Sequence, residues 1–349
     1  MIKQNLSSKD RFFFNRIFAG IKMPPLEFKL IYKENLYALL NAYISEGKLI
    51  QASQILKEEK IKDFADLKLD QIELVLAKEN FRVNYYNTRI QSRKEGTKVI
   101  SDFVWNGSTK PCQRGTIEDS IHQKVEDRIN YFRVSAGVPP IYLDSQLNDW
   151  CQRAALVMET TNRLNHELPK SWACYSPEAA EAAKFSLLTQ NATTTLAVTS
   201  FVADQTHPTL GNRRWMLYPF SMIWGHGSTK TKCVIWALDD SRKRDTLYYA
   251  ANFVAWPYNG YVSKMFLFKK WSFSLFADMT DAKVTMVMNK KPVNLTLENL
   301  VEGYGLPTLV WTPQLDLTQL KEGDKIDVTI KLKGNKTYYY SVKVFDYQL

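Results

Sequence analysis

The sequence predicts an α+β protein of several domains, in which a central α/β/α unit stands between a small helical module and a β-sandwich. Three observations lead to this prediction. The chain has 349 residues, more than a single hydrophobic core usually organises. Apolar residues recur at helical spacing in long segments that precede Asp245. After Asp245, short segments rich in β-branched and aromatic residues replace this pattern, and such segments are typical of strands.

Residues 1–102 are expected to form the small helical module. A helical hairpin is predicted over 32–57, where Gly47 closes the turn between two apolar stripes. A longer helix is predicted over 70–94. We expect this module to pack against the rest of the chain or to bind a protein partner.

Residues 103–116 are rich in turn-forming residues and predict a linker. The central unit follows at 117–250. It begins with a long amphipathic helix, because apolar residues recur at steps of three and four from Ile117 to Ala136. Gly137 and two prolines that follow it end this helix.

Three further helices are predicted in the central unit. Asp144 or Ser145 caps the first of them. Ser176 caps the next, and Pro177 occupies its first helical position. The last covers about 195–204. Two strands are expected after these helices, near 212–217 and 232–238.

Residues 251–349 are expected to form an immunoglobulin-like β-sandwich. Short alternating segments joined by turns are typical of this architecture. The predicted strands cover 271–278, 283–288, 293–297, 308–312, 325–332 and 337–345.

The charge distribution argues against a nucleic-acid partner. The formal net charge is +10, and the excess is +7 in residues 1–116, zero in 117–250 and +3 in 251–349. A nucleic-acid-binding protein is expected to gather basic charge on its working domain, and here the central unit is neutral. An anionic surface such as a membrane or a cell wall stays a weak possible attractant.

Cysteine spacing leaves the redox state open. The four cysteines fit neither a zinc knuckle nor a redox CxxC, and they allow three disulfide pairings or burial as free thiols. No segment has the length of a transmembrane helix. The first residues lack the layout of a signal peptide, so the protein either is not exported by that route or begins here after a removed leader.

Several motifs in order resemble the CAP superfamily, which comprises the cysteine-rich secretory, antigen 5 and pathogenesis-related proteins. The resemblance is greatest to a bacterial-type, SCP-like subgroup in which a β-domain follows the CAP unit, and it covers about residues 110–345. The matching segments are Arg128 to Arg133 with Pro139, Pro140 and Asp144, then Ala154 to Met158 leading to His166, Trp172 to Glu178, Gly211 to Trp215, and Trp256 with Pro257.

The resemblance implies a cleft with two histidines and two acidic residues that can hold a divalent metal. His166 matches the first histidine, Glu178 the first acidic residue and Asp204 the second. Asn212 occupies the position of the second histidine. An amide oxygen is a weaker ligand than imidazole for zinc-like metals, so His166 and Glu178 would at best hold a divalent ion loosely. His207 could supply the missing imidazole.

Other side chains near this cleft have alternative explanations. Glu181 can share a helix face with Glu178, and a carboxylate in a first turn also stabilises the helix without any function. Arg213 or Arg214 could line a rim that accepts anions. On a strand the two would point to opposite faces, so only one of them would contribute.

Three functions remain open at this point. The resemblance implies a non-enzymatic binding protein, extracellular or in the cell envelope, for a lipid, a sterol or another envelope ligand. A hydrolase would use His166 with Ser171 or Ser176, or a metal-bound water, but the third orienting group is missing. A surface scaffold would bind partners through the helical module and the sandwich.

Overall fold

The computed structural model describes residues 69–95, 98–205, 208–238 and 253–347. The predicted helical hairpin lies outside these ranges. The chain divides into two compact units after Asp63, and every described residue belongs to the second unit, Phe64–Leu349. None of the described helices is long and apolar enough to cross a membrane.

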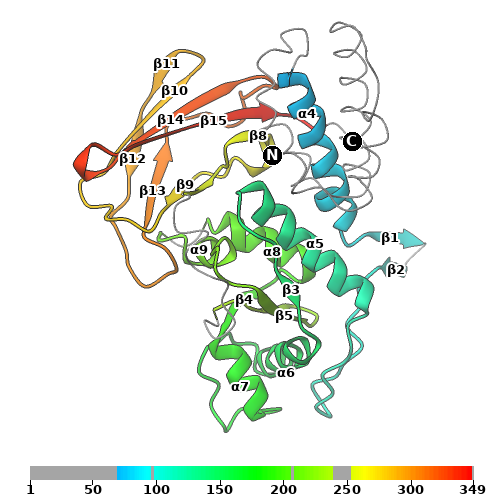
Figure 1. Cartoon of the computed structure of the whole chain (residues 1–349). Coiled ribbons are helices and arrows are strands. Elements are labelled where there is room, and N and C mark those ends of the chain that lie inside the picture. Colours follow the sequence, from blue (N-terminus) through cyan, green and yellow to red (C-terminus); the bar gives the residue numbers. More distant parts are fainter. Residues whose placement is uncertain (1–68, 96–97, 206–207, 239–252, 348–349) are drawn as a thin grey trace, which may run out of the picture. The chain divides into compact units, whose positions relative to one another are not determined.

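A four-stranded sheet with helices on both sides forms the centre of the second unit (Figure 1). The strand order is β3-β5-β6-β4, in which β3 runs parallel to β5 and the other neighbours are antiparallel. Helices α6 and α7 cover one face, and α5, α8 and α9 cover the other. The bounds are α5 Asp119–Ser135, β3 Tyr142–Leu143, α6 Ser145–Thr161, α7 Pro177–Lys184, β4 Ser186–Gln190, α8 Thr194–Ala203, α9 Gly211–Met216, β5 Ile223–Ser228 and β6 Lys232–Trp236.

Local sequence signals position these helices as expected. Asp144 caps α6 by accepting a hydrogen bond from the backbone N–H of Leu147 at 2.9 Å. Ser176 caps α7 in the same way through Ala179, at 3.2 Å. Each cap satisfies a backbone N–H that has no partner within its helix.

The strand expected over 212–217 is wrong, because this segment is helix α9. The carboxylate of Asp204 accepts hydrogen bonds from the backbone N–H groups of Asn212 and Arg213, at 2.9 and 3.4 Å. A buried carboxylate at this position satisfies the first N–H groups of a helix, which a strand would offer to a neighbouring strand instead.

The N-terminal end of the described chain packs into the main core, and the expected module boundary at residue 102 stays a prediction. The expected helix 70–94 is divided into α4 (Leu69–Asn80), a π-helical turn η3 (Phe81–Tyr85) and a 3₁₀ turn η4 (Tyr86–Thr88). A hairpin of β1 (Ser92–Glu95) and β2 (Lys98–Ser101) follows. Phe81 is buried, and its ring contacts Tyr131, Phe266 and Phe345. These contacts join the N-terminal segment to both the central unit and the β-domain.

Two facing sheets form the C-terminal part. Their orders are β11-β10-β14-β15-β8 and β12-β13-β9-β7, and large buried aromatic residues such as Trp271, Phe273 and Trp311 lie in the core. This is the layering of a sandwich, and the immunoglobulin-like assignment stays a prediction. The bounds are β7 Val254–Trp256, β8 Gly260–Ser263, β9 Trp271–Ser274, β10 Lys283–Met288, β11 Lys291–Val293, β12 Leu295–Leu297, β13 Thr308–Pro313, β14 Lys325–Lys331 and β15 Thr337–Phe345.

Arg213 joins the central unit to the β-domain. Its guanidinium is buried, with 1% of the residue exposed. It donates hydrogen bonds to the carbonyl oxygens of Val202 (2.6 Å) and Ala203 (2.8 Å) at the end of α8, and to that of Lys270 (2.8 Å) just before β9. Burial lowers the pKa of Arg213, and the nearby Asp204 opposes this effect.

Arg214 makes a second connection of the same kind. It donates to the carbonyl oxygens of Val301 and Leu306 at 2.8 and 2.9 Å, and it lies over the ring of Tyr304. The expected anion-accepting rim is therefore wrong. Both arginines are buried and donate to backbone carbonyls, Arg213 to those of α8 and of the β-domain and Arg214 to those of the β-domain.

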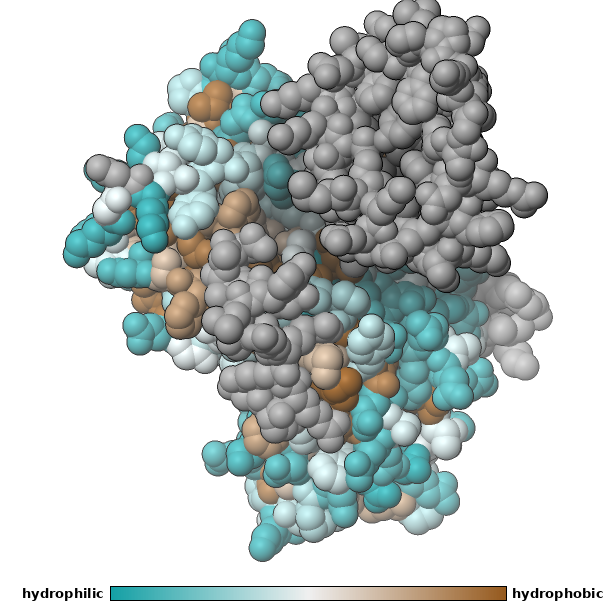
Figure 2. Space-filling model, viewed as in Figure 1, coloured by the Kyte–Doolittle hydropathy of each residue, from teal (hydrophilic) through white to brown (hydrophobic). Residues whose placement is uncertain are grey.

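Surface hydropathy is uneven over the described residues. Figure 2 shows that the surface of the central unit turned toward the viewer is mainly hydrophilic, with apolar residues in small scattered spots. Scattered apolar residues are normal on a protein surface and need no ligand to explain them.

We predict that Arg213→Ala lowers the free energy of unfolding by about 3 kcal/mol, because several buried carbonyl groups lose a charged donor. Urea unfolding measures the change. Arg163→Ala is the matched control, since Arg163 is exposed. A loss in Arg213→Ala no larger than the loss in the control would contradict the structural role.

Candidate functional site

His166 lies beside α7, and Glu178 is part of this helix. His166 is exposed, and its Nδ1 is 2.9 Å from the carbonyl oxygen of Ala183. Glu178 is in the first turn of α7. The hydroxyl of Ser176 and the backbone N–H of Glu178 lower the pKa of its carboxyl, so this carboxylate serves the start of the helix. Glu181, one turn later, is exposed.

Asp204 precedes α9 in the chain, and Asn212 is in the first turn of α9. The two side chains are hydrogen-bonded to each other. The Oδ1 of Asp204 accepts a hydrogen bond from the Nδ2 of Asn212 at 2.9 Å, in addition to the backbone bonds described above. Asp204 is buried and Asn212 is half-buried. The amide at the position of the expected second histidine thus has a partner in the expected second acid. His207 lies outside the described residues.

The structure does not bring these four side chains into one metal site. Helix α7 packs against α6 and the sheet on one face, whereas α9 packs into the core on the opposite face. Within the described ranges, no group of three or more histidine, cysteine, aspartate or glutamate side chains is placed to hold a metal ion. The described residues therefore do not fit the expected metal.

The two serines expected as nucleophiles also have other surroundings. The hydroxyl of Ser176 accepts the cap hydrogen bond of α7. Ser171 is exposed, and the structure gives it no contact with His166. The expected Ser/His pairing is not formed by these residues.

The segment 103–116, expected as a linker, is bound to the central unit as a strap. A disulfide between Cys112 and Cys174 fixes it, with the two Cα atoms 5.5 Å apart. Within the strap, the Nε1 of Trp105 donates to the carbonyl of Arg114 at 2.8 Å. Asn106 bonds the backbone N–H and the hydroxyl of Thr116. The strap is therefore folded on itself as well as crosslinked.

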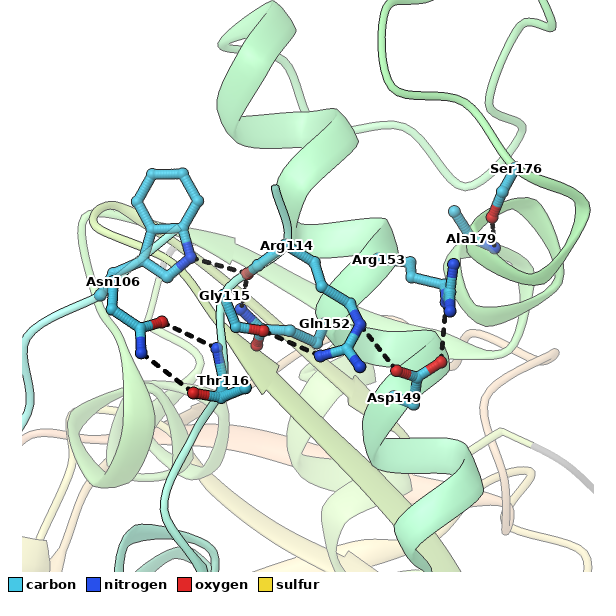
Figure 3. A network of polar contacts seen from close by, with 10 residues as sticks. Asn106, Arg114, Gly115, Thr116, Asp149, Gln152, Arg153, Ser176 and Ala179 are labelled. Carbon is cyan, nitrogen blue, oxygen red and sulfur yellow. Dashed lines mark hydrogen bonds and ion pairs between the residues drawn. The ribbon is translucent and has the colours of Figure 1, made fainter. Parts of the chain in front are cut away.

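Polar contacts connect the strap to α6 (Figure 3). Arg114 and Arg153 approach the two carboxylate oxygens of Asp149, at 2.8 and 2.7 Å. Asp149 raises the pKa of Arg153, and Glu178 contributes a smaller attraction. The partly exposed surface between the strap, α6 and α7 thus carries two cations, Arg114 and Arg153, and two carboxylates, Asp149 and Glu178.

Gln152 carries this network into the interior. Its Nε2 donates to the carbonyl of Arg114 at 2.8 Å and to that of Ser228 at 3.0 Å, and its Oε1 accepts from the backbone N–H of Ser228 at 2.8 Å. A Cβ on Gly227 would lie 2.3 Å from the backbone of Cys151, so only glycine lets β5 approach α6 this closely. The glycines beside His226 have this packing role.

Two histidines form a buried polar pair that the sequence did not predict. In β5, His226 is fully buried, and its Nδ1 is 3.2 Å from the Nδ1 of His122 in α5. Its Nε2 is 2.9 Å from the hydroxyl oxygen of Ser228. The two histidines are 104 residues apart, and the local sequence signal is only a histidine between two glycines.

This chain of serine and two histidines has the order of a nucleophile, a base and an orienting group. Its burial argues against that use. Ser228 is fully buried, and its hydroxyl oxygen also accepts a hydrogen bond from the backbone N–H of Thr194 at 3.0 Å. No substrate atom can reach this oxygen in the described arrangement. The cluster therefore connects α5, α6 and β5, and it holds them together.

Comparison with known proteins identifies one segment. Residues 126–232 match the family model described as CAP, the cysteine-rich secretory protein family. A matching solved structure is the crystal structure of an extracellular protein containing a SCP domain from Bacillus anthracis str. Ames, with 14% identity and a TM-score of 0.26. The match covers 40% of this chain and 45% of that one, and a TM-score of this size carries no structural argument. No curated protein matches this chain.

We predict that stability falls as the pH is lowered below about 6.5, the ordinary pKa of histidine. Burial lowers the pKa of both His226 and His122, and the charge of His122 lowers that of His226 further; Asp119 opposes the shift at His122. Groups with a lowered pKa stabilise the fold when neutral, and this contribution is lost as they are protonated. The loss approaches about 1.4 kcal/mol per pH unit for each histidine.

Urea unfolding at pH 7.5, 6.5 and 5.5 tests this prediction. The His122→Gln variant should lose less stability over this interval than the unmodified protein, because one titrating group and its charge are gone. If the free energy of unfolding falls equally with pH in the two proteins, the histidine pair is not responsible.

We predict that Cys112→Ser/Cys174→Ser lowers the free energy of unfolding by about 2–4 kcal/mol, because the crosslink restricts the unfolded chain. Trypsin should then cleave after Arg114 in the native protein, since the strap loses its crosslink. In the unmodified protein, thiol titration in denaturant should detect two thiols before reduction, those of the buried Cys151 and Cys233. Detection of four thiols before reduction would contradict the disulfide.

Proposed function

Starting from the CAP domain that residues 126–232 carry, we propose that this chain is a non-enzymatic binding protein of the extracellular space or the cell envelope. The disulfide between Cys112 and Cys174 supports this location, because such bonds persist in oxidising compartments.

The burial of Ser228 and His226 is the observation that favours binding over catalysis. A nucleophile and its base must meet the substrate, and these two side chains have no exposed surface. The family's metal positions support the same view. Asp204 and Asn212 satisfy each other there, and Asp204 holds the start of α9. Side chains engaged in this way stabilise the fold and have little capacity left for a ligand.

The proposed ligand class follows from the surfaces that are not engaged in folding contacts. A lipid, a sterol or another envelope component is expected from the family. The described surfaces favour a polar component, since the strap region is charged and a pocket of about 740 Å³ has a mainly polar and charged lining. This pocket lies among Lys78, Lys264, Thr318, Gln319, Leu320, Lys321, Glu322, Asp346 and Tyr347.

We predict that the purified full chain binds envelope material without turnover. Native mass spectrometry detects a bound lipid or sterol, and co-sedimentation detects binding to insoluble envelope polymer. Assays with labelled casein and with a chromogenic ester should give rates equal to the buffer blank.

The Ser228→Ala variant decides the alternative of a hydrolase. Activity that is present in the unmodified protein and absent in this variant would overturn the proposal, provided that circular dichroism shows both proteins folded. Ser171→Ala is the comparison variant, because Ser171 is exposed and was expected from the sequence, together with Ser176, as a possible nucleophile beside His166.

A further inference from the structure

We propose that the outer face of the sheet β11-β10-β14-β15-β8 binds an anionic polysaccharide through a lysine edge, defined as Lys283, Lys331, Lys333 and Lys336. The proposal takes its extracellular setting from the proposed function and adds a partner at a different surface. All four lysines are exposed. They lie at the start of β10, at the end of β14 and in the turn between β14 and β15. This turn is at the left of Figure 1.

Strand register brings the lysines of this edge together. Lys283 and Lys331 are direct cross-strand partners. The turn after β14 is closed by a hydrogen bond from the backbone N–H of Leu332 to the carbonyl of Lys336, at 2.9 Å. Like charges directly opposite each other destabilise a sheet, so this arrangement costs stability unless an anion is bound.

A second lysine pair on the same sheet provides a contrast. Lys325 and Lys343 are also direct cross-strand partners. Lys325 forms an ion pair with Asp327 at 2.8 Å, and Lys343 forms one with Glu73 at 3.2 Å. This pair is neutralised within the protein.

The lysine edge has no comparable neutralisation. Among the described residues, neither Lys283 nor Lys331 has a carboxylate within ion-pair distance. Two acids lie near the edge in sequence, the exposed Asp281, two residues before Lys283, and Asp278, whose pKa is lowered first by hydrogen bonds from Thr280 and to a smaller extent by Lys333. The excess positive charge therefore remains available to an external anion.

The row beside the lysines favours a glycan over a membrane. Thr285, Thr329 and Tyr339 are consecutive partners across β10, β14 and β15, two residues from Lys283, Lys331 and Thr337 along each strand. Tyr339 is 70% exposed. Hydroxyl groups and an exposed ring on a flat face suit the hydroxyls and C–H faces of sugars. A surface that enters a bilayer would present a larger apolar area.

Attraction between charges does not account for the row formed by Thr285, Thr329 and Tyr339. Lysines attract any polyanion over distances of about 10 Å at moderate salt, and added salt screens that attraction. Tyr339 carries no charge and contributes only when a ligand lies against the strands. A ligand that needs both the lysine edge and Tyr339 is therefore an anionic polymer with a sugar backbone.

The test uses the full chain and polygalacturonate, with its methyl-esterified form as the uncharged control ligand. Affinity electrophoresis measures retention. Lys283→Ala/Lys331→Ala should reduce affinity at least tenfold. Lys325→Ala/Lys343→Ala removes the same number of charges from a cross-strand pair of the same sheet, on β14 and β15, and should change affinity less than twofold. Tyr339→Ala should reduce affinity at least threefold without a change in net charge.

A single variant separates the ligand role from a stability role. Lys283→Glu creates an opposite-charge pair with Lys331, so it should raise the denaturation midpoint while it abolishes retention. A merely structural lysine pair would show the rise in midpoint without any loss of binding.

Four outcomes would overturn the proposal. They are absence of retention in the unmodified protein, equal retention by the methyl-esterified polymer, an equal loss in the two double-lysine variants, and binding to vesicles of phosphatidylglycerol that depends on the lysine edge while polygalacturonate is ignored. None of them affects the proposed absence of catalysis, which the hydrolase assays test separately.

Discussion

Buried arginine side chains bonded to backbone carbonyls hold the described unit together. Arg128, Arg133, Arg213 and Arg214 are all buried, and they donate hydrogen bonds to carbonyl or hydroxyl oxygens. A buried guanidinium is costly unless its donors are satisfied. Carbonyl groups at the end of a helix lack partners inside that helix and carry its negative dipole end, so they suit this cation. Each arginine thereby fixes one segment against another.

Through these arginines, the segment Gly211 to Trp215 connects the central unit to the β-domain. Asn212 and Asp204 bond each other and begin α9, and the next two residues extend into the β-domain. These side chains are engaged in folding contacts. We therefore place the proposed binding on surfaces outside these positions, such as the strap region and the lysine edge.

The strap and the histidine pair are parts of one network. Gln152 bonds the strap on one side and β5 on the other, and β5 carries His226. A change in the crosslink at Cys112 and a change in protonation at His122 act on neighbouring members of this network. Polar networks of this kind specify one arrangement when every member is satisfied, and they become costly when one member is lost.

Local signals in the sequence determined the helices with clear caps and the alternating strands of the C-terminal part, since Asp144 and Ser176 act on backbone groups three residues away. The CAP resemblance was equally accessible, because motifs keep their order along the chain. Only the tertiary structure decided that Cys112 pairs with Cys174, that His122 meets His226, and that the segment after Leu210 is a helix. These features depend on contacts between residues that are distant in sequence or on a cap supplied from another segment, and the periodicity of a chain carries no information about such contacts.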